Sequence, residues 1–384
     1  MIYLDYAAST PLDPRVLEAM LPYFSEQFGN PSSIHRYGQR ADAAVENARR
    51  TIAGLLSCAA DEIIFTSGGT ESDNLALRGT ALAERTRRGA NHILVSAVEH
   101  HAVRHTAEQL ASLFGFDLEF IPTGSNGMVT PDEVNRRLRR ETAIVSIIHG
   151  NNEIGTINPV QEIGAVCHEH GVLFHTDAVQ SAAHFPMNLQ TMNVDLLSIG
   201  AHKFYGPKGT GVLFIRKGTP IIPTQTGGAQ EFNLRAGTSN VPYLVGMAEA
   251  LSLVSAQQDN NEHHLSVLRD KIIRTLLETI PDCRLTGHPQ ERLPNHCSFA
   301  FRGLESNNLL MILDSMGFAC ASGSACKTGT PGASEILQAL GFDPTWSKGA
   351  LRVTIGRPTG EDDINQFLEA IPLAVSKARK LSVD

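Results

Sequence analysis

The sequence predicts an α/β protein, with a large domain built on a mostly parallel seven-stranded sheet and a smaller α+β domain after it. Three observations predict this fold. The length of 384 residues favours about two domains over a single core. Through the middle of the chain, short and continuously apolar runs alternate with amphipathic segments, as in a parallel sheet covered by helices on both faces. A fresh set of strands and helices begins in the last third.

Each strand of the large sheet is predicted from an apolar run of strand length. In chain order, these runs are EIIFTS, HILVSAV, DLEFIP, AIVSIIH, GVLFHTDA, DLLSIGA and GVLFIRK. Helices before or between them are predicted for ENARRTIAGLL, ESDNLALRGTALAERTRR and VQEIGAVCHEHG. Strands and helices therefore alternate through this part of the chain, as the fold class requires.

A single long helical region, predicted for residues 246–280, connects the large domain to the smaller one. The smaller domain is predicted to contain the strands NHCSFAF and ALRVTIG and the helices LLMILDSMG and EDDINQFLEAIPLAVSKAR. The N-terminal segment is expected to pack with these elements. We therefore expect a large domain at 16–255 and a small domain made of 1–15 and 256–384.

The composition is that of a folded protein without marked affinity for nucleic acid or membranes. Apolar residues make up 42% of the chain, the net charge is -8, and there is no long basic run. The start MIYLDYAASTPLDPR lacks the pattern of a secretory signal, and no apolar run could span a bilayer. The six cysteines form no CxxC pair, which argues against a bound metal or a disulfide framework. A cytoplasmic protein is expected.

The stretch TSGGTESDN follows directly on a predicted strand and opens a helix. Gly68 and Gly69 allow a tight turn that brings backbone N–H groups close to a ligand, and Thr70 lies where the helix begins. Unpaired amides and the helix dipole favour a phosphate at such a place. A glycine turn with a threonine N-cap has the same pattern without any ligand.

Polar residues follow three other predicted strands, at the edge where a parallel sheet binds its ligands. Asp177 ends one strand and could pair with a protonated pyridine nitrogen, with Gln180 within reach, or could cap the next helix. His100 or His101 in EHHAV is a candidate for ring stacking and proton transfer, although a lone histidine is more often structural. Asn152 in NNEIG offers an amide or occupies a turn.

The stretch AHKFYGPKGTG brings His202 and Lys203 from another strand end to the same edge. Taken alone, Lys203 would be a solvated loop charge, and Lys208 in the tight turn GPKG is expected to be one. Beside a phosphate cup, a partner for a pyridinium and a histidine, Lys203 fits pyridoxal phosphate better than any nucleotide. We expect Lys203 to form a Schiff base with this cofactor, helped by desolvation that lowers the pKa of its amine.

These motifs resemble the pyridoxal-phosphate-dependent cysteine desulfurases of the class V aminotransferase family. The resemblance covers nearly the whole chain, in the order YLDYAASTP, FGNPSSIH, TSGGTESDN, EHHAV, NNEIG, DAVQS, AHKFYGPKG, RAGTSN, SGSAC and LRVTIGR. It implies the type I fold of pyridoxal-phosphate enzymes, a homodimer with active sites at the subunit interface, and a persulfide mechanism. It also implies that Thr238 reaches the phosphate of the neighbouring subunit, and that Asn152 and Arg352 hold the substrate carboxylate.

The pattern around Arg352 supports its assignment. Arg352 alternates with Leu351 and Val353, so it points to the opposite face of its strand from that apolar pair. A planar guanidinium can grip a carboxylate at two points. Arg357 is the second candidate, but it lies between Gly356 and a proline, which is more typical of a turn.

Cys326 is the expected sulfur nucleophile, on the strength of the SGSAC match. It lies among small residues and glycines, which suits a mobile loop at about 320–334 that both enters the active site and meets an acceptor outside. The neighbouring Lys327 favours the thiolate. The alternative is an ordinary small residue in a flexible loop. Cys320 is predicted to be a buried strand residue.

Two features of this sequence differ from the family that it resembles. Many relatives have a serine two residues before the His-Lys pair, where it contacts the phosphate, and this chain has Gly200. The chain also ends soon after a helix rich in lysine and arginine, whereas housekeeping relatives carry a longer tail that binds the iron–sulfur scaffold. Docking to that kind of scaffold is therefore not expected from the tail.

The expected activity is conversion of L-cysteine to L-alanine, with the sulfur passed to Cys326 as a persulfide and then to an acceptor protein. The acceptor would serve iron–sulfur cluster assembly or another thiolation pathway. Lys203 and His100 complete the expected catalytic set. The cofactor-binding residues are expected to be Gly69, Thr70, His100, Asp177, Gln180, His202, Lys203 and Thr238. The alternatives are a selenocysteine lyase or another class V enzyme, and a non-catalytic scaffold for sulfur transfer.

Overall fold

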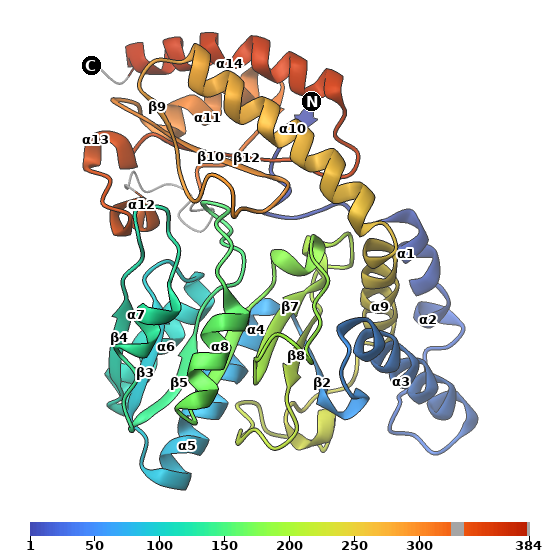
Figure 1. Cartoon of the computed structure of the whole chain (residues 1–384). Helices are drawn as coiled ribbons and strands as arrows, with labels where there is room; N and C mark the ends of the chain where they lie inside the picture. Colours follow the sequence, from blue (N-terminus) through green and yellow to red (C-terminus); the bar gives the residue numbers. More distant parts are fainter. Residues whose placement is uncertain (324–333, 382–384) are drawn as a thin grey trace.

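The structure is a computed structural model that describes residues 1–323 and 334–381. It consists of a lower body with a large sheet and an upper body with smaller sheets (Figure 1). In spatial order, the large sheet contains β2 (Ile63–Thr66), β8 (Gly211–Ile215), β7 (Leu196–Gly200), β6 (Leu173–Asp177), β5 (Thr142–Ser146), β3 (His92–Ser96) and β4 (Asp117–Ile121). All seven predicted runs therefore form its strands.

The large sheet is mostly parallel, as predicted. Strands β7, β6, β5, β3 and β4 pair in parallel with their neighbours, whereas β8 runs antiparallel to both β7 and β2. Strand β2 consequently points the same way as the parallel strands. The carboxyl ends of β2, β3, β5, β6 and β7 thus meet at one edge of the sheet, where ligands of such sheets bind.

Both faces of the large sheet are buried, which explains why its strands are continuously apolar. Successive strand residues alternate between two cores: Phe65 and Val145 face one core, and their neighbours Ile64 and Ile144 face the other. The helices around the sheet are α1 (Pro14–Met20), α2 (Pro22–Ser25), α3 (Arg36–Leu56), α4 (Gly69–Asn74), α5 (Thr80–Arg88), α6 (His101–Phe114), α7 (Pro131–Asn135), α8 (Val160–Glu169) and α9 (Val241–Ser255).

The upper body has its own apolar core. Its three-stranded antiparallel sheet has the order β12 (Ala350–Thr354), β10 (His296–Phe301) and β9 (Cys283–Leu285). Strand β1 (Ile2–Tyr3) pairs in parallel with β11 (Phe318–Ala319), which ties the N-terminus to this body. The helices of this body are α10 (Gln258–Thr279), α11 (Ser306–Ser315), α12 (Glu335–Ala339), α13 (Pro344–Ser347) and α14 (Glu361–Leu381).

The region predicted as one long helix is two helices. Helix α9 ends at Ser255 and α10 begins at Gln258, and Gln257 between them has a non-helical φ of -118°. The break lies where the chain passes from the lower core to the upper core (Figure 1). Two separate cores support the expected division at residues 16 and 255, which stays a prediction.

A second predicted helix is continuous but uneven. Between α4 and α5, residues Leu75–Gly79 form a π-helical turn, so the predicted segment of 71–88 is helical along its length with one wider turn. Among the described residues, none of the helices has both the length and the apolar character needed to cross a membrane.

Candidate active site

A cavity of about 510 Å³ opens at the carboxyl ends of the large sheet. Its volume lies within the range of about 300–1,000 Å³ that is usual for cofactor and small-molecule sites. Eight residues predicted for the site line its wall: Gly69, Thr70, His100, Asn152, Asp177, Gln180, His202 and Lys203. They come from the ends of five strands, so the sheet topology brings them together.

The glycine turn after β2 forms one wall of this cavity. Gly68 has a φ of +150°, a conformation that favours glycine, and helix α4 begins directly after it at Gly69. A Cβ added to Gly69 would lie 2.5 Å from Cγ2 of Val179, so the turn has no room for a side chain there. The backbone can therefore approach a ligand closely, with N–H groups at the start of a helix.

Gly200 borders the same turn. A Cβ added at Gly200 would lie 3.4 Å from the backbone nitrogen of Gly69, in ordinary van der Waals contact. A serine at this position would thus place its hydroxyl next to the glycine turn. Because this chain has glycine there, the turn lacks that donor.

Asp177 and Lys203 lie on the wall of the same cavity. Asp177 ends strand β6, is 4% exposed, and accepts a hydrogen bond of 2.9 Å from the backbone N–H of Val179. Burial raises the pKa of its carboxyl to about 6, although the hydrogen bond from Val179 and the charge of Lys203 oppose the shift. The ammonium of Lys203 donates to the backbone oxygens of Ala7 at 2.6 Å and Ala8 at 2.9 Å.

His100 rather than His101 lines the cavity. Its Nδ1 accepts a hydrogen bond of 3.2 Å from the backbone N–H of Ala102 and thereby caps helix α6. Burial, together with the charge of Lys203, lowers the pKa of His100 to about 4, so the ring is neutral at pH 7. With Nδ1 as acceptor, the ring proton lies on Nε2. His101 instead stacks on His105, with ring centres 4.8 Å apart.

Two buried carboxyl groups near Asp177 were not predicted as site residues. Asp73, on helix α4, is 1% exposed, and Glu99, directly before His100, is 3% exposed. Burial raises the pKa of both, that of Glu99 to about 8. The motif letters TESDN and EHHAV contain both residues, but nothing in a single sequence shows that they are buried side by side.

One group of described residues has ligand atoms spaced as a metal site would require. Donor atoms of Asp73, His100 and Asp177 all lie within 4.8 Å of one another. These three residues share the cavity with Lys203 and the glycine turn. The carboxyl groups of Asp73 and Asp177 therefore also suit a protonated ring nitrogen. The absence of a bound metal stays a prediction.

Arg352 and Asn152 form a corner beside the cavity. The guanidinium of Arg352 donates from Nη1 to the backbone oxygens of Asn152 at 3.0 Å and Gly323 at 3.2 Å, and from Nη2 to Asp5 at 2.8 Å. Within the described residues, the buried Nε of Arg352 and Oδ1 of Asn152 have no hydrogen-bond partner. Unsatisfied buried polar atoms are costly and indicate a place for a polar ligand.

The remaining predicted residues lie elsewhere. Thr238 is exposed and is not part of the cavity wall. Cys326 lies outside the described residues. Cys320, predicted to be a buried strand residue, directly follows β11 and is half-buried, and desolvation raises the pKa of its thiol. The other described cysteines are Cys58, Cys167, Cys283 and Cys297, and burial raises the pKa of each to about 12.

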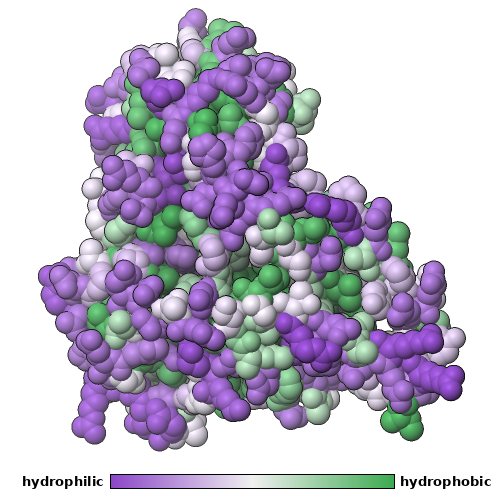
Figure 2. All heavy atoms as spheres, turned by 45° about the vertical axis from the view of Figure 1, so that its right-hand side comes forward, coloured by the Kyte–Doolittle hydropathy of each residue, from purple (hydrophilic) through white to green (hydrophobic). Residues whose placement is uncertain are grey.

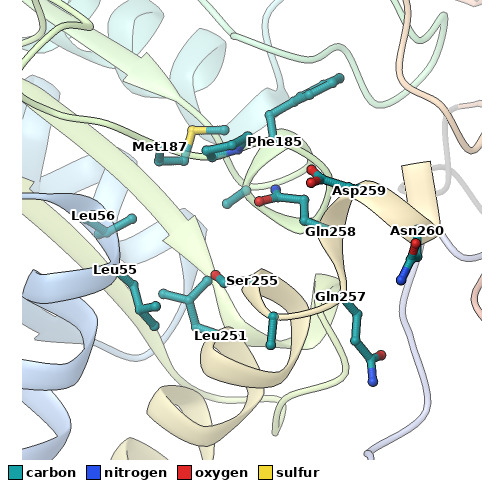
Figure 3. Close-up of a pocket in the computed structure, with 13 residues that line it drawn as sticks. Leu55, Leu56, Phe185, Met187, Leu251, Ser255, Gln257, Gln258, Asp259 and Asn260 are labelled. Atoms are coloured by element: carbon teal, nitrogen blue, oxygen red, sulfur yellow. The ribbon is translucent and has the colours of Figure 1, made fainter. Parts of the chain in front are cut away.

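A second cavity, of about 460 Å³, lies beside the break between α9 and α10 (Figure 3). One side is apolar and carries Leu55, Leu56, Phe185, Met187 and Leu251. The other side is polar and carries Gln257, Gln258, Asp259 and Asn260. None of the predicted site residues lines it.

Comparison with known proteins agrees with this arrangement. The family model described as Aminotransferase class-V matches residues 2–367, and the chain belongs to the class V aminotransferase family. Among curated relatives, a protein of Dictyoglomus turgidum named cysteine desulfurase IscS is 45% identical over 99% of this chain and 96% of its own length.

Solved structures are similar as well. A structure titled NIFS-LIKE PROTEIN has a TM-score of 0.90 and 34% identity, covering 98% of this chain and 99% of its own. A structure titled SspA in complex with cysteine has a TM-score of 0.80 and 32% identity, covering 92% and 99%. The predicted α/β fold and the resemblance to cysteine desulfurases are therefore confirmed.

The family uses pyridoxal phosphate, and the residues of the cavity fit this cofactor. A lysine amine and a buried carboxylate line one cavity, as a Schiff-base aldehyde and a pyridine nitrogen require. The glycine turn leaves no room for a Cβ at Gly69 and presents backbone N–H groups at a helix start, which suits a phosphate. Asp177 would hold the ring nitrogen, and Lys203 the aldehyde carbon.

Proposed function

We propose that this protein is a cysteine desulfurase that converts L-cysteine to L-alanine and passes the sulfur to Cys326 as a persulfide. The observation that carries the proposal is the convergence of Lys203, Asp177 and His100 on one cavity, in a chain that matches cysteine desulfurases over nearly its full length. The related structure titled SspA in complex with cysteine supports an amino-acid substrate of this kind.

Pyridoxal phosphate, when bound, withdraws electrons from the bonds at the substrate α-carbon. Lys203 Nζ takes the α-proton, because it lies on the cavity wall that the substrate amine must approach. Asp177 is the carboxylate that stabilises a positive charge on the ring nitrogen. Asn152 and Arg352 orient the substrate through its carboxylate, so that the α-proton faces the lysine.

His100 is suited to moving protons near the reacting carbon and sulfur. It is neutral at pH 7 and carries its proton on Nε2, so it can donate this proton and recover it from solvent or substrate. The Cys326 thiolate attacks the substrate sulfur. A sulfur–sulfur bond forms as the carbon–sulfur bond breaks, and the carbon keeps the bonding electrons and takes up a proton to give alanine.

The functional unit is proposed to be a homodimer. Thr238 is exposed on its own subunit, as expected for a residue that reaches the phosphate of a neighbour. Apolar patches interrupt the polar surface in Figure 2, which brings forward the side of the molecule that carries α1 to α3. The large apolar residues exposed in this part of the chain are Leu17, Leu21, Phe24, Phe28, Ile34 and Tyr37.

The acceptor of the sulfur is proposed to be a protein of iron–sulfur cluster assembly or of another thiolation pathway in the cytoplasm. Relatives named IscS support this part of the proposal. Two acceptor classes can be separated by incubating the enzyme with labelled cysteine and following the label into a purified scaffold protein or a thiolation protein.

The first test measures alanine and sulfide released from L-cysteine with a reductant, for the natural protein and Cys326→Ala. We expect the natural protein to release both products and the variant neither. A variant with full activity would show that Cys326 is not the nucleophile and would favour a lyase that ejects the chalcogen directly. Lys203→Ala should lose the absorbance of the cofactor bound through lysine; a variant that keeps this absorbance refutes the lysine assignment.

A further inference from the structure

The N-terminal segment YLDYAASTP lines the active site, although the mechanism above assigns it no role. Ala7 and Ala8 offer their backbone oxygens to the Lys203 ammonium. The same Ala7 oxygen accepts from the side-chain amide of Gln180 at 2.8 Å. Asp5 reaches the opposite end of the site and contacts Arg352. One short segment therefore touches both the cofactor lysine and the proposed substrate arginine.

Asp5 provides the carboxylate that pairs with Arg352. The distance from Asp5 Oδ1 to Arg352 Nη2 is 2.8 Å, and the arginine side chain is 3% exposed while that of Asp5 is 20% exposed. Glu153 is a second acidic group whose pKa the charge of Arg352 affects, and it is half-buried. Burial raises the pKa of Glu153, and this shift favours its neutral form, so Asp5 is the better placed counter-charge.

The three hydrogen bonds of Arg352 to described residues leave two of its five N–H groups unused, that of Nε and one of Nη2. Nη1 is occupied by two backbone oxygens, and Nη2 is bound to Asp5, but Nε has no hydrogen-bond partner among the described residues. The Nε and Nη2 groups form the side edge of a guanidinium, where a carboxylate binds with two parallel hydrogen bonds. Asp5 therefore contacts one of the two nitrogens of the edge that a substrate carboxylate would take.

We propose that Asp5 sets the affinity of the site for amino acids, as an internal carboxylate that holds Arg352 in the resting enzyme and competes with the carboxylate of the incoming amino acid. The proposal rests on the assignment of Arg352 as the anchor of the substrate carboxylate. A substrate with a carboxylate displaces Asp5 from Nη2 and gains both donors of the edge. An amine without a carboxylate does not compete with Asp5 for Arg352, so its binding does not depend on Asp5.

The consequence is a site that binds α-amino acids more weakly. Like charges within a few ångströms disfavour each other, so Asp5 reduces the affinity for every α-amino acid by a similar factor. Asp5 also prevents the buried arginine from binding small anions when no substrate is bound. The ligand class that this corner recognises is an α-amino carboxylate, and the strength of recognition is set by Asp5.

The test compares the holoenzyme with its Asp5→Asn variant in equilibrium titrations followed by the absorbance of the bound cofactor. The two probes are L-alanine, which has a carboxylate, and ethylamine, which is the same molecule without one. Asparagine keeps the shape and can still accept from Nη2 but has no charge. We expect the Kd of L-alanine to fall about tenfold, as for the loss of one close like charge, with the Kd of ethylamine unchanged.

The KM for L-cysteine should fall with the Kd of L-alanine, while kcat changes little. An unchanged or higher Kd for L-alanine would overturn the proposal, and so would an equal fall for both probes. If Asp5→Asn does not fold, Asp5→Ser removes the same charge with a smaller side chain. Tyr3→Phe is the matched control, because it removes a hydroxyl bound to the backbone of this segment and leaves Asp5 charged.

Arg352→Gln separates this proposal from the one on which it rests. If Arg352 anchors the carboxylate, the variant should bind L-alanine no better than ethylamine, whichever residue stands at position 5. A variant that still prefers L-alanine would refute the anchor itself. If Arg352→Gln loses the preference for L-alanine over ethylamine but Asp5→Asn leaves the Kd of L-alanine unchanged, the role of Asp5 alone is refuted.

Discussion

Replacement of Glu99 by glutamine should stabilise the protein, and by more at high pH than at low pH. Glu99 is 3% exposed, and its Oε1 accepts hydrogen bonds from the backbone N–H of Ile148, at 2.8 Å, and from the hydroxyl of Ser96. Its Oε2 is buried without a hydrogen-bond partner among the described residues. Glutamine keeps the accepting oxygen and replaces the second oxygen by a neutral group, so it resembles the protonated acid.

The magnitude follows from the pKa of the buried acid. Burial raises the pKa of Glu99 to about 8 in the folded protein, whereas an exposed glutamate titrates near pH 4.3. Between these two values the unfolded chain has released the proton and the folded chain still holds it, so stability falls as pH rises. At about 1.4 kcal/mol per pH unit, Glu99 lowers the unfolding free energy by about 1 kcal/mol at pH 5, about 3 to 4 kcal/mol at pH 7 and about 5 kcal/mol at pH 9.

The assay is urea unfolding of both proteins at these three pH values and one protein concentration. His100 and His175, whose lowered pKa values have no contribution from Glu99, are present in both proteins and cancel in the difference. The gain in unfolding free energy for Glu99→Gln should therefore grow with pH. A difference that is constant from pH 5 to pH 9, or that reverses at high pH, would show that Glu99 is ionised in the folded protein.

Three further changes test other parts of the structure. Gly200→Ser should raise the affinity for pyridoxal phosphate about fivefold in equilibrium dialysis, since one added hydrogen bond contributes about 1 kcal/mol; an unchanged affinity places the phosphate elsewhere. Gly69→Ala should weaken cofactor binding because its Cβ meets Val179 at 2.5 Å, and Val179→Ala in the same chain should restore part of it. Arg49→Ala should lower the unfolding free energy by about 3 kcal/mol or more, because Glu231 is left buried without its cation; adding Glu231→Gln should recover part of this loss, and no recovery contradicts the explanation.

Much of the fold could be predicted because its strands have a strong and simple pattern. Each strand of the large sheet is buried on both faces, so its run is continuously apolar and easily recognised. The break after α9 gave no such pattern. Residues Ser255 to Gln258 contain neither glycine nor proline, and the chain turns there because the two helices pack into different cores.

Some residues of the candidate site could likewise be predicted from the sequence, and others could not. Asp177, His100 and Lys203 follow strands directly, and the topology of a parallel sheet alone places them at one edge. Asp5 could not be assigned in this manner, because it meets Arg352 across 347 residues of sequence. Asp73 lies within a helix whose buried face becomes evident only when the helix is packed against the sheet.

The pairing of β1 with β11 has a consequence for the order in which the enzyme is made. Ile2 and Tyr3 leave the ribosome long before their partners Phe318 and Ala319, which follow 316 residues later in the chain. The lower core, complete by residue 255, can fold while synthesis continues, since domains fold as units from the N-terminal side. Strand β1 must wait for β11 of the upper body, so the nascent chain assembles the cofactor side of the site before the corner that contains Asp5 and Arg352.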